Sequence, residues 1–242
     1  MSTAVGAATY RGPVPIAAWK DLCVDVVDPE LMGPFWAETL GLEPVRLDDG
    51  DVLLGGPTPQ HRVWLNTVPE PVTVKQRVHL DVRAASTDEV LARGATPVDV
   101  GRLKWDALKD PEGGELCVFP PRSEPGDVPS YRLLELVVDA VDAHEITAWW
   151  AEVLGATVQD NDGEEAFSWF EDAPGMPFAM CFQEVPEPKT VKNRVHWDVE
   201  TDDLQGLLDR GATLLREPDD AVSWHVLADP EGNEFCVFRP GQ

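Results

Sequence analysis

Residues 35–41 read Phe-Trp-Ala-Glu-Thr-Leu-Gly, and the chain repeats them as Trp-Trp-Ala-Glu-Val-Leu-Gly at residues 149–155, an offset of 114 positions. Further sequences recur in the same order, at offsets of 117 to 119: Val-Pro-Glu-Pro at 68–71 and 185–188, Arg-Val-His at 77–79 and 194–196, and Asp-Pro-Glu-Gly at 110–113 and 229–232. Because the offset drifts by only five positions, the two copies differ by short insertions. A period this long exceeds the ~20–50 residues of a solenoid unit and predicts two homologous domains.

The repeats set the expected domain boundaries. We predict an N-terminal extension over residues 1–18, a first domain over 19–121 and a second over 131–240. The intervening residues 122–130 are rich in proline, as linkers often are.

Each copy shows the pattern strand, helix and three strands, twice over. Residues 21–27 alternate polar and apolar side chains, which is typical of a half-buried strand. Asp28 and Pro29 then suit the N-cap and first turn of a helix, and Gly41 suits its end. The expected apolar stripe of this helix comprises Leu31, Phe35 and Leu40.

Composition excludes several classes of function. Among 242 residues, 44 Asp and Glu face 19 Lys and Arg, so the net charge is -25, which disfavours nucleic acid and anionic lipid as partners. No apolar run approaches the ~18–20 residues of a membrane span, and the first residues do not resemble a signal peptide. Four cysteines without a CxxC pair favour buried structural thiols. We therefore expect a cytoplasmic protein.

Three sequences carry a family resemblance: Phe-Trp-Ala-Glu-x-Leu-Gly, Val-Pro-Glu-Pro-x-Thr-Val-Lys-x-Arg-Val-His and Asp-Pro-Glu-Gly-x-Glu-x-Cys-Val-Phe. With the βαβββ pattern, they resemble the glyoxalase/bleomycin-resistance/dioxygenase (vicinal oxygen chelate) superfamily, and in particular the glyoxalase-like domains common in actinobacteria. The resemblance implies an α+β fold of two tandem domains, each a pair of βαβββ modules that form a half-open eight-stranded cup. Whether the modules pair within a copy or between copies stays open.

The resemblance also implies a divalent metal, such as Fe, Mn, Ni or Zn, held by inward residues on the first, fifth and last strands of a cup. The positions that match are Asp21, His79 and Glu115 in copy one and Glu135, His196 and Glu234 in copy two. Strand alternation independently places these side chains on the faces opposite the apolar residues. Copy two is the preferred site, with Glu135 or Glu234 also serving as the base.

The fourth ligand position of the family departs from the pattern. It falls on Trp64 or Asn66 in copy one and on Cys181 or Gln183 in copy two, and none of these is the carboxylate of a four-ligand glyoxalase. This departure argues against isomerisation of lactoylglutathione.

Simpler interpretations stay open for several of these residues. His79 and His196 would also serve as wall residues hydrogen-bonded to Asp81 and Asp198, and Glu115 and Glu234 would also cap the turns that precede them.

Trp64, Trp105, Trp224 and His225 are the candidates for substrate binding. In the crossover segments, the cations that could reach an anionic ligand are Lys75, Arg77, Lys192 and Arg194.

Two functions are therefore compatible with the sequence. The first is a metal-dependent lyase or isomerase that acts on a small oxygen-rich or aromatic metabolite. The second is a metal-free protein that binds a small molecule or sequesters an antibiotic. Since four modules in one chain can imitate the dimer of two-module relatives, a monomer or a homodimer is expected.

Overall fold

The computed structural model describes residues 14–99, 101, 104–120, 128–161 and 167–242. Residues 1–13 of the expected extension and residues 121–127 around the expected linker lie outside the described residues. The chain forms four βαβββ modules, which we number one to four. Module one comprises β1 (Ala18–Val26), α1 (Pro29–Leu40), β2 (Glu43–Arg46), β3 (Val52–Gly55), a 3-10 turn (Pro59–His61) and β4 (Val63–Thr67). Module two comprises β5 (Val78–Arg83), α2 (Thr87–Ala92), β6 (Thr96–Pro97), β7 (Asp106–Lys109) and β8 (Glu115–Phe119). Module three comprises β9 (Leu133–Ala140), α3 (Ala143–Leu154), β10 (Gln159–Asn161), β11 (Phe167–Phe170) and β12 (Ala179–Glu184). Module four comprises β13 (Val195–Glu200), α4 (Leu204–Asp209), β14 (Thr213–Arg216), β15 (His225–Ala228) and β16 (Glu234–Phe238).

The helix signals of the repeated sequence act as predicted. Asp28 caps α1 by accepting hydrogen bonds from the backbone N–H groups of Glu30 and Leu31, and Gly41 ends the helix with a φ of 70°. The predicted apolar stripe is wrong at one position, because Leu31 is 47% exposed. Besides Phe35 and Leu40, the large side chains that α1 buries are those of Met32 and Trp36.

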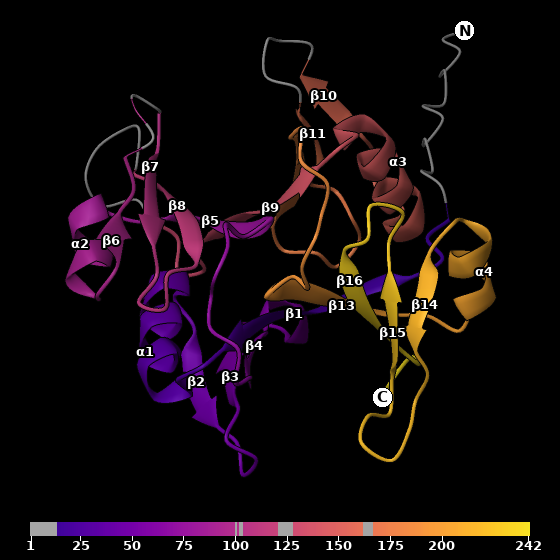
Figure 1. Cartoon of the computed structure of the whole chain (residues 1–242), viewed down its shortest axis with the longest axis horizontal. Coiled ribbons are helices and arrows are strands. Elements are labelled where there is room, and N and C mark those ends of the chain that lie inside the picture. The colour runs from indigo at the N-terminus through magenta and orange to yellow at the C-terminus, as the bar shows by residue number, and fades with distance from the viewer. Residues whose placement is uncertain (1–13, 100, 102–103, 121–127, 162–166) are drawn as a thin grey trace, which may run out of the picture.

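The fold class is α+β, with two open eight-stranded sheets (Figure 1). The modules pair between the two copies. Sheet A runs β14-β15-β16-β13-β1-β4-β3-β2 and so joins module one to module four, and sheet B runs β10-β11-β12-β9-β5-β8-β7-β6 and joins module two to module three. The central contacts are antiparallel, β1 with β13 and β5 with β9. We call the concave sides of sheets A and B cup A and cup B.

Aromatic side chains of α3 bind the two sheets together. Trp150 belongs to module three, yet its ring lies 5.2 Å from that of Trp197 on β13 and 5.0 Å from that of Phe235 on β16. Its indole N–H donates to Asp229 Oδ2 at 3.0 Å. Trp150 is fully buried, and Trp36, its repeat on α1, is 3% exposed. Both side chains therefore pack in the interior.

The Asp-Pro-Glu-Gly turns form a second link between the sheets. Glu112, before β8 of sheet B, accepts the backbone N–H groups of Val27 at 2.9 Å and Asp28 at 2.7 Å, at the start of α1. Its repeat Glu231, before β16 of sheet A, accepts the N–H groups of Val141 and Asp142 in module three. Each glutamate thus fixes the helix entry of a module in the other sheet.

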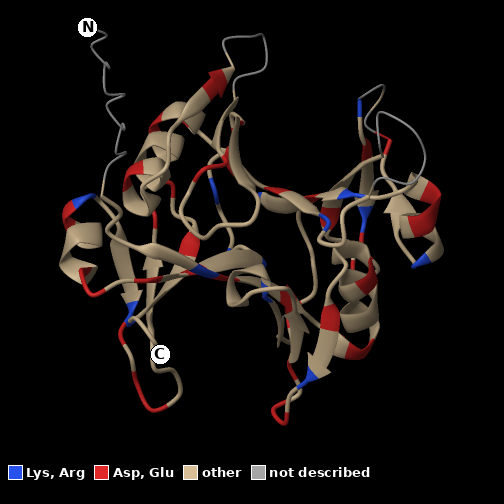
Figure 2. Ribbon diagram, turned by 180° about the vertical axis from the view of Figure 1, so that it is seen from behind, with Lys and Arg blue, Asp and Glu red and all other residues tan. Residues whose placement is uncertain are grey.

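Acidic residues dominate the ribbon, with Lys and Arg few between them (Figure 2). No helix in the described part of the chain is long and apolar enough to cross a membrane. All four cysteines are free thiols, and three of them are buried, with Cys117 half-buried.

Candidate functional site

Each sheet combines one module from each copy, so the predicted site residues group by sheet and not by copy. Sheet A carries Asp21, Trp64, His196 and Glu234. Sheet B carries His79, Glu115 and Glu135. The structure therefore does not bring Glu135 into one cup with His196 and Glu234, as the copy-two set requires. The physical reason is that β9 pairs with β5 and not with β13.

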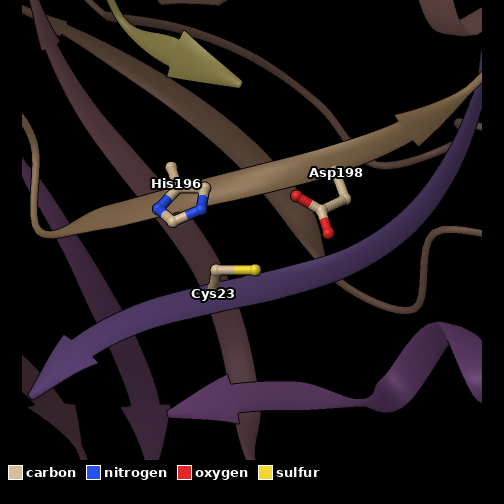
Figure 3. Close-up of side chains that lie close together, drawn as sticks. All are labelled: Cys23, His196 and Asp198. Carbon is tan, nitrogen blue, oxygen red and sulfur yellow. The ribbon is translucent and has the colours of Figure 1, made fainter. Parts of the chain in front are cut away.

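The closest group of potential metal ligands in cup A is Cys23, His196 and Asp198 (Figure 3). One ligand atom from each lies within 4.8 Å of the others. Cys23 on β1 pairs directly with His196 on β13, and Asp198 follows two residues along the same strand, on the same face. Within the described chain, His196 Nδ1 and Asp198 Oδ1 are buried without a hydrogen-bond partner. Buried polar atoms of this kind are costly and point to an additional binding partner.

Burial controls the charges of this group. It lowers the pKa of His196 to about 4, so the imidazole is neutral and able to act as a ligand. Burial, together with the nearby Asp21 carboxylate, raises the pKa of Asp198 to about 7. The pKa of the Cys23 thiol is also raised well above its usual value, by burial and by Asp198. This environment therefore disfavours negative charge on Asp198 and Cys23.

Two of the predicted ligands in cup A are already held by cations. Glu234 accepts from Lys189 Nζ at 2.6 Å and from the backbone N–H of Asn193 at 3.1 Å. Asp21 accepts from Lys20 Nζ at 2.5 Å. Glu234 thus links β16 to the crossover between β12 and β13.

Cup B carries a similar group, but its cysteine comes from β8 and is the repeat of Cys236, not of Cys23. Its group of potential ligands is His79, Asp81 and Cys117, and His79 Nε2 lies 3.3 Å from Asp81 Oδ1. Glu135 on β9 pairs directly with Asp81 on β5. Burial, and then the Asp81 carboxylate, raise the pKa of Glu135 to about 7. Glu115 accepts the backbone N–H of Gln76 at 3.0 Å, as Glu234 does in cup A.

The tryptophan candidates occupy distinct places. Trp64 pairs with Cys23 in the strand register and so shares its face in cup A. Trp105 stacks on Phe119 in sheet B, with ring centroids 5.5 Å apart, and Trp224 stacks on Phe238 in sheet A, with centroids 5.2 Å apart.

The structure places His225 outside cup A. It pairs with Val237, which lies on the face of β16 opposite Cys236. It lines a separate cavity of about 760 Å³ beside Thr201 and Gln242.

The sequence did not identify Cys23 and Asp198, or Asp81 and Cys117, as members of ligand groups. A signal was present, because Asp81 and Asp198 stand two residues after the predicted histidines and share their strand face. Cys23 joins the ligand group because β1 pairs with β13, and the alternation of residues along one strand does not predict which strands pair.

Paired βαβββ modules that form open eight-stranded cups define the vicinal oxygen chelate architecture. The chain belongs to the family of glyoxalase-like domains, whose sequence model matches residues 21–119 and 135–238. Its fold is similar to that of glyoxalase I from Zea mays, with a TM-score of 0.62 and 13% identity, over 91% of this chain and 92% of that chain. A candidate dioxygenase from Bacillus subtilis gives a TM-score of 0.62 and 12% identity, over 94% and 86%. At these identities the likeness establishes the fold alone. No curated protein matches the chain.

Proposed function

We propose that the protein binds a small oxygen-rich or aromatic metabolite in cup A, next to a divalent metal held by Cys23, His196 and Asp198, for chemistry of the lyase or isomerase type. The observation that carries the proposal is the buried Nδ1 of His196, without a partner in the described structure, beside two further ligand atoms within 4.8 Å.

The chemistry of the three residues fits a metal. A neutral imidazole is the ligand form of histidine, and a dication would stabilise the Asp198 carboxylate and the Cys23 thiolate, both of which burial destabilises. A thiolate in the set favours Zn(II), Fe(II) or Ni(II) over Mn(II). When bound, such an ion supplies Lewis-acid polarisation of a substrate oxygen.

The protein's own residues would bind the substrate and transfer the proton. The indole of Trp64, paired with Cys23, offers an apolar surface beside the ligand group. Glu234 is the proton-transfer residue of cup A, held in place by Lys189. In cup B, the candidate for this role is Glu135, whose pKa of about 7 suits both gain and loss of a proton near neutral pH.

Cobalt(II) provides a direct test of the metal site, because a cobalt–thiolate bond gives a charge-transfer band that identifies a cysteine ligand. We expect about one equivalent of Co(II) to bind with this band, and both the band and the binding to be lost in Cys23→Ser and His196→Ala. The controls are Cys117→Ser and His79→Ala, which alter the ligand group of cup B. Metal content of untagged protein, purified without chelator, gives a second measurement.

Two outcomes would refute the metal site in cup A. One is a wild-type protein that takes up none of Co(II), Zn(II), Ni(II) and Fe(II). The other is a thiolate band that survives Cys23→Ser and disappears in Cys117→Ser, which would assign the metal to cup B.

A metal-free binding or antibiotic-sequestering protein is the second candidate. The observation in its favour is that Glu234 and Glu115 are engaged by Lys189 and by backbone N–H groups. In this case the cups would bind an aromatic ligand through side chains such as Phe167 and Trp169, whose rings lie 5.5 Å apart. Quenching of tryptophan fluorescence by aromatic and cationic compounds, unchanged by chelator, would favour this function.

Both cups are completed within one chain, which supports a monomer. The four free thiols support the cytoplasm, where reductants maintain cysteine in this form.

A further inference from the structure

A cavity of about 500 Å³ lies between the two crossover segments of the chain, outside the ligand groups of both cups. One wall is formed by residues 68–77, between β4 and β5, and the other by residues 191–194, between β12 and β13. The volume is in the range of ~300–1,000 Å³ that is usual for sites of small organic molecules.

The lining concentrates positive charge in a strongly acidic protein. Four of the 19 Lys and Arg residues of the chain line the cavity, against two carboxylates, Asp25 and Glu70. The four cations are repeats of one another: Lys75 and Arg77 from the first crossover, Lys192 and Arg194 from the second. In a chain whose net charge of -25 repels anions, this group of four cations is a local exception that can attract one.

Buried carboxylates hold the two lysines in place. Lys192 pairs with Asp25, whose side chain is 6% exposed, while that of Lys192 is 60% exposed. Lys75 pairs with Asp139 in the same way, with exposures of 67% for the lysine and 6% for the aspartate. An ammonium has three donors, so a bond to a carboxylate on the protein side leaves donors that a ligand can reach from the open side.

The two arginines make the walls rigid. Arg77 donates to the backbone oxygens of Glu187 at 2.6 Å and Asp139 at 2.8 Å, and Arg194 donates to those of Glu70 and Asp25. Each arginine therefore ties its own crossover to the opposite one. Such a site needs little rearrangement on binding, which favours affinity.

Apolar side chains complete the cavity. Val74 and Val191, equivalent residues of the two crossovers, are 50% and 46% exposed and both line it. Exposed valines beside fixed ammonium groups match a molecule with an apolar body and an anionic end.

We propose that this cavity binds a small organic anion, a carboxylate or a phosphate attached to an apolar body, between the ammonium groups of Lys75 and Lys192. The site adjoins cup A at Asp25, which follows Cys23 on the same face of β1, but it contains none of the proposed metal ligands and does not depend on a metal. The two lysines act as equivalent anion contacts, and the two valines contact the apolar body.

The test uses the full-length protein and four probes: benzoate, phenyl phosphate, inorganic phosphate and the neutral benzyl alcohol. Titration calorimetry or ligand-observed NMR should show binding of benzoate or phenyl phosphate, weakened by salt, with inorganic phosphate and benzyl alcohol binding less tightly. The preference between the first two distinguishes a carboxylate from a phosphate ligand.

Variants locate the binding. The double variant Lys75→Gln, Lys192→Gln should weaken binding by about tenfold or more, because two charge-assisted contacts are lost. The charge-preserving pair Lys75→Arg, Lys192→Arg should largely retain it. Lys104→Gln, at an exposed lysine away from the cavity, is the matched control, and near-ultraviolet circular dichroism verifies the fold of each variant.

Three outcomes would overturn the proposal: no binding of any anionic probe to the wild type, equal binding to the wild type and the folded Gln double variant, or binding that His196→Ala abolishes and the double variant retains. The last would place the anion in cup A. The proposed metal site is tested by cobalt uptake, so either proposal can fail alone.

Discussion

Removal of the Glu112 carboxylate should destabilise the protein through the link between the two sheets. Glu112 accepts the N–H groups of Val27 and Asp28 at 2.9 and 2.7 Å and lies 3.5 Å from Arg194 Nη2. Its side chain is only 11% exposed, so water can replace these bonds only in part. Glu112→Ala therefore leaves two backbone donors at the start of α1 without their acceptor.

The expected magnitude follows from the two bonds. A hydrogen bond to a charged group contributes ~1.5–3 kcal/mol, and we take the lower end because the site lies near the surface. Glu112→Ala should then lower the free energy of unfolding by about 3 kcal/mol. Glu112→Gln keeps one acceptor oxygen without the charge, so its loss should be roughly half as large.

Urea titration followed by tryptophan fluorescence and far-ultraviolet circular dichroism measures this loss. Glu217→Ala, at an exposed glutamate without such bonds, is the control and should change stability by less than about 0.5 kcal/mol. Glu231→Ala should match Glu112→Ala, because Glu231 makes the equivalent bonds to Val141 and Asp142. The reasoning is refuted if both alanine variants are as stable as the control.

Two further predictions concern a buried carboxyl and a glycine. Burial raises the pKa of Asp229 to about 6. Between about pH 4 and pH 6 the folded state therefore keeps a proton on this carboxyl that the unfolded state has lost. As the pH rises through this range, the stability of the wild type should fall by up to about 3 kcal/mol relative to Asp229→Asn. Urea titration at several pH values measures the difference between the two proteins, and a difference that does not depend on pH would contradict this prediction. Gly41 has a φ of 70°, and a Cβ there would lie 1.8 Å from the backbone oxygen of Ser130, so Gly41→Ala should lower stability by more than about 3 kcal/mol. Gly50→Ala, with a φ of 98° but open space around it, should lose only about 1 kcal/mol in the same thermal and urea unfolding experiments, and equal losses would show that the contact with Ser130 is unimportant.

The sequence predicted the local structure well because local structure depends on neighbouring residues. The cap at Asp28 and the stop at Gly41 were visible in a few consecutive positions. The prediction that β1 is half-buried was wrong, because residues 21–26 are buried on both faces of the strand. Repetition then made the four modules recognisable, since the same signals recur at a nearly constant offset.

The pairing of modules depends on contacts between distant residues, and the sequence does not contain it. Both copies carry compatible strand edges, so Cys23 could meet His79 or His196 with equal plausibility. The partners of Glu234 were hidden for the same reason, because Lys189 lies in a segment whose path only the three-dimensional structure defines.

The exchange of modules has a consequence for the growing chain during synthesis. β1 pairs with β13 along a register in which Ala18 lies opposite Glu200, so the first strand lacks its antiparallel neighbour until module four emerges from the ribosome. Sheet B, whose strands lie between residues 78 and 184, can form earlier. Native pairings over such long sequence separations form slowly. Module one therefore exposes an apolar strand edge for most of translation, when chaperones or rapid packing of α1 would protect it from aggregation.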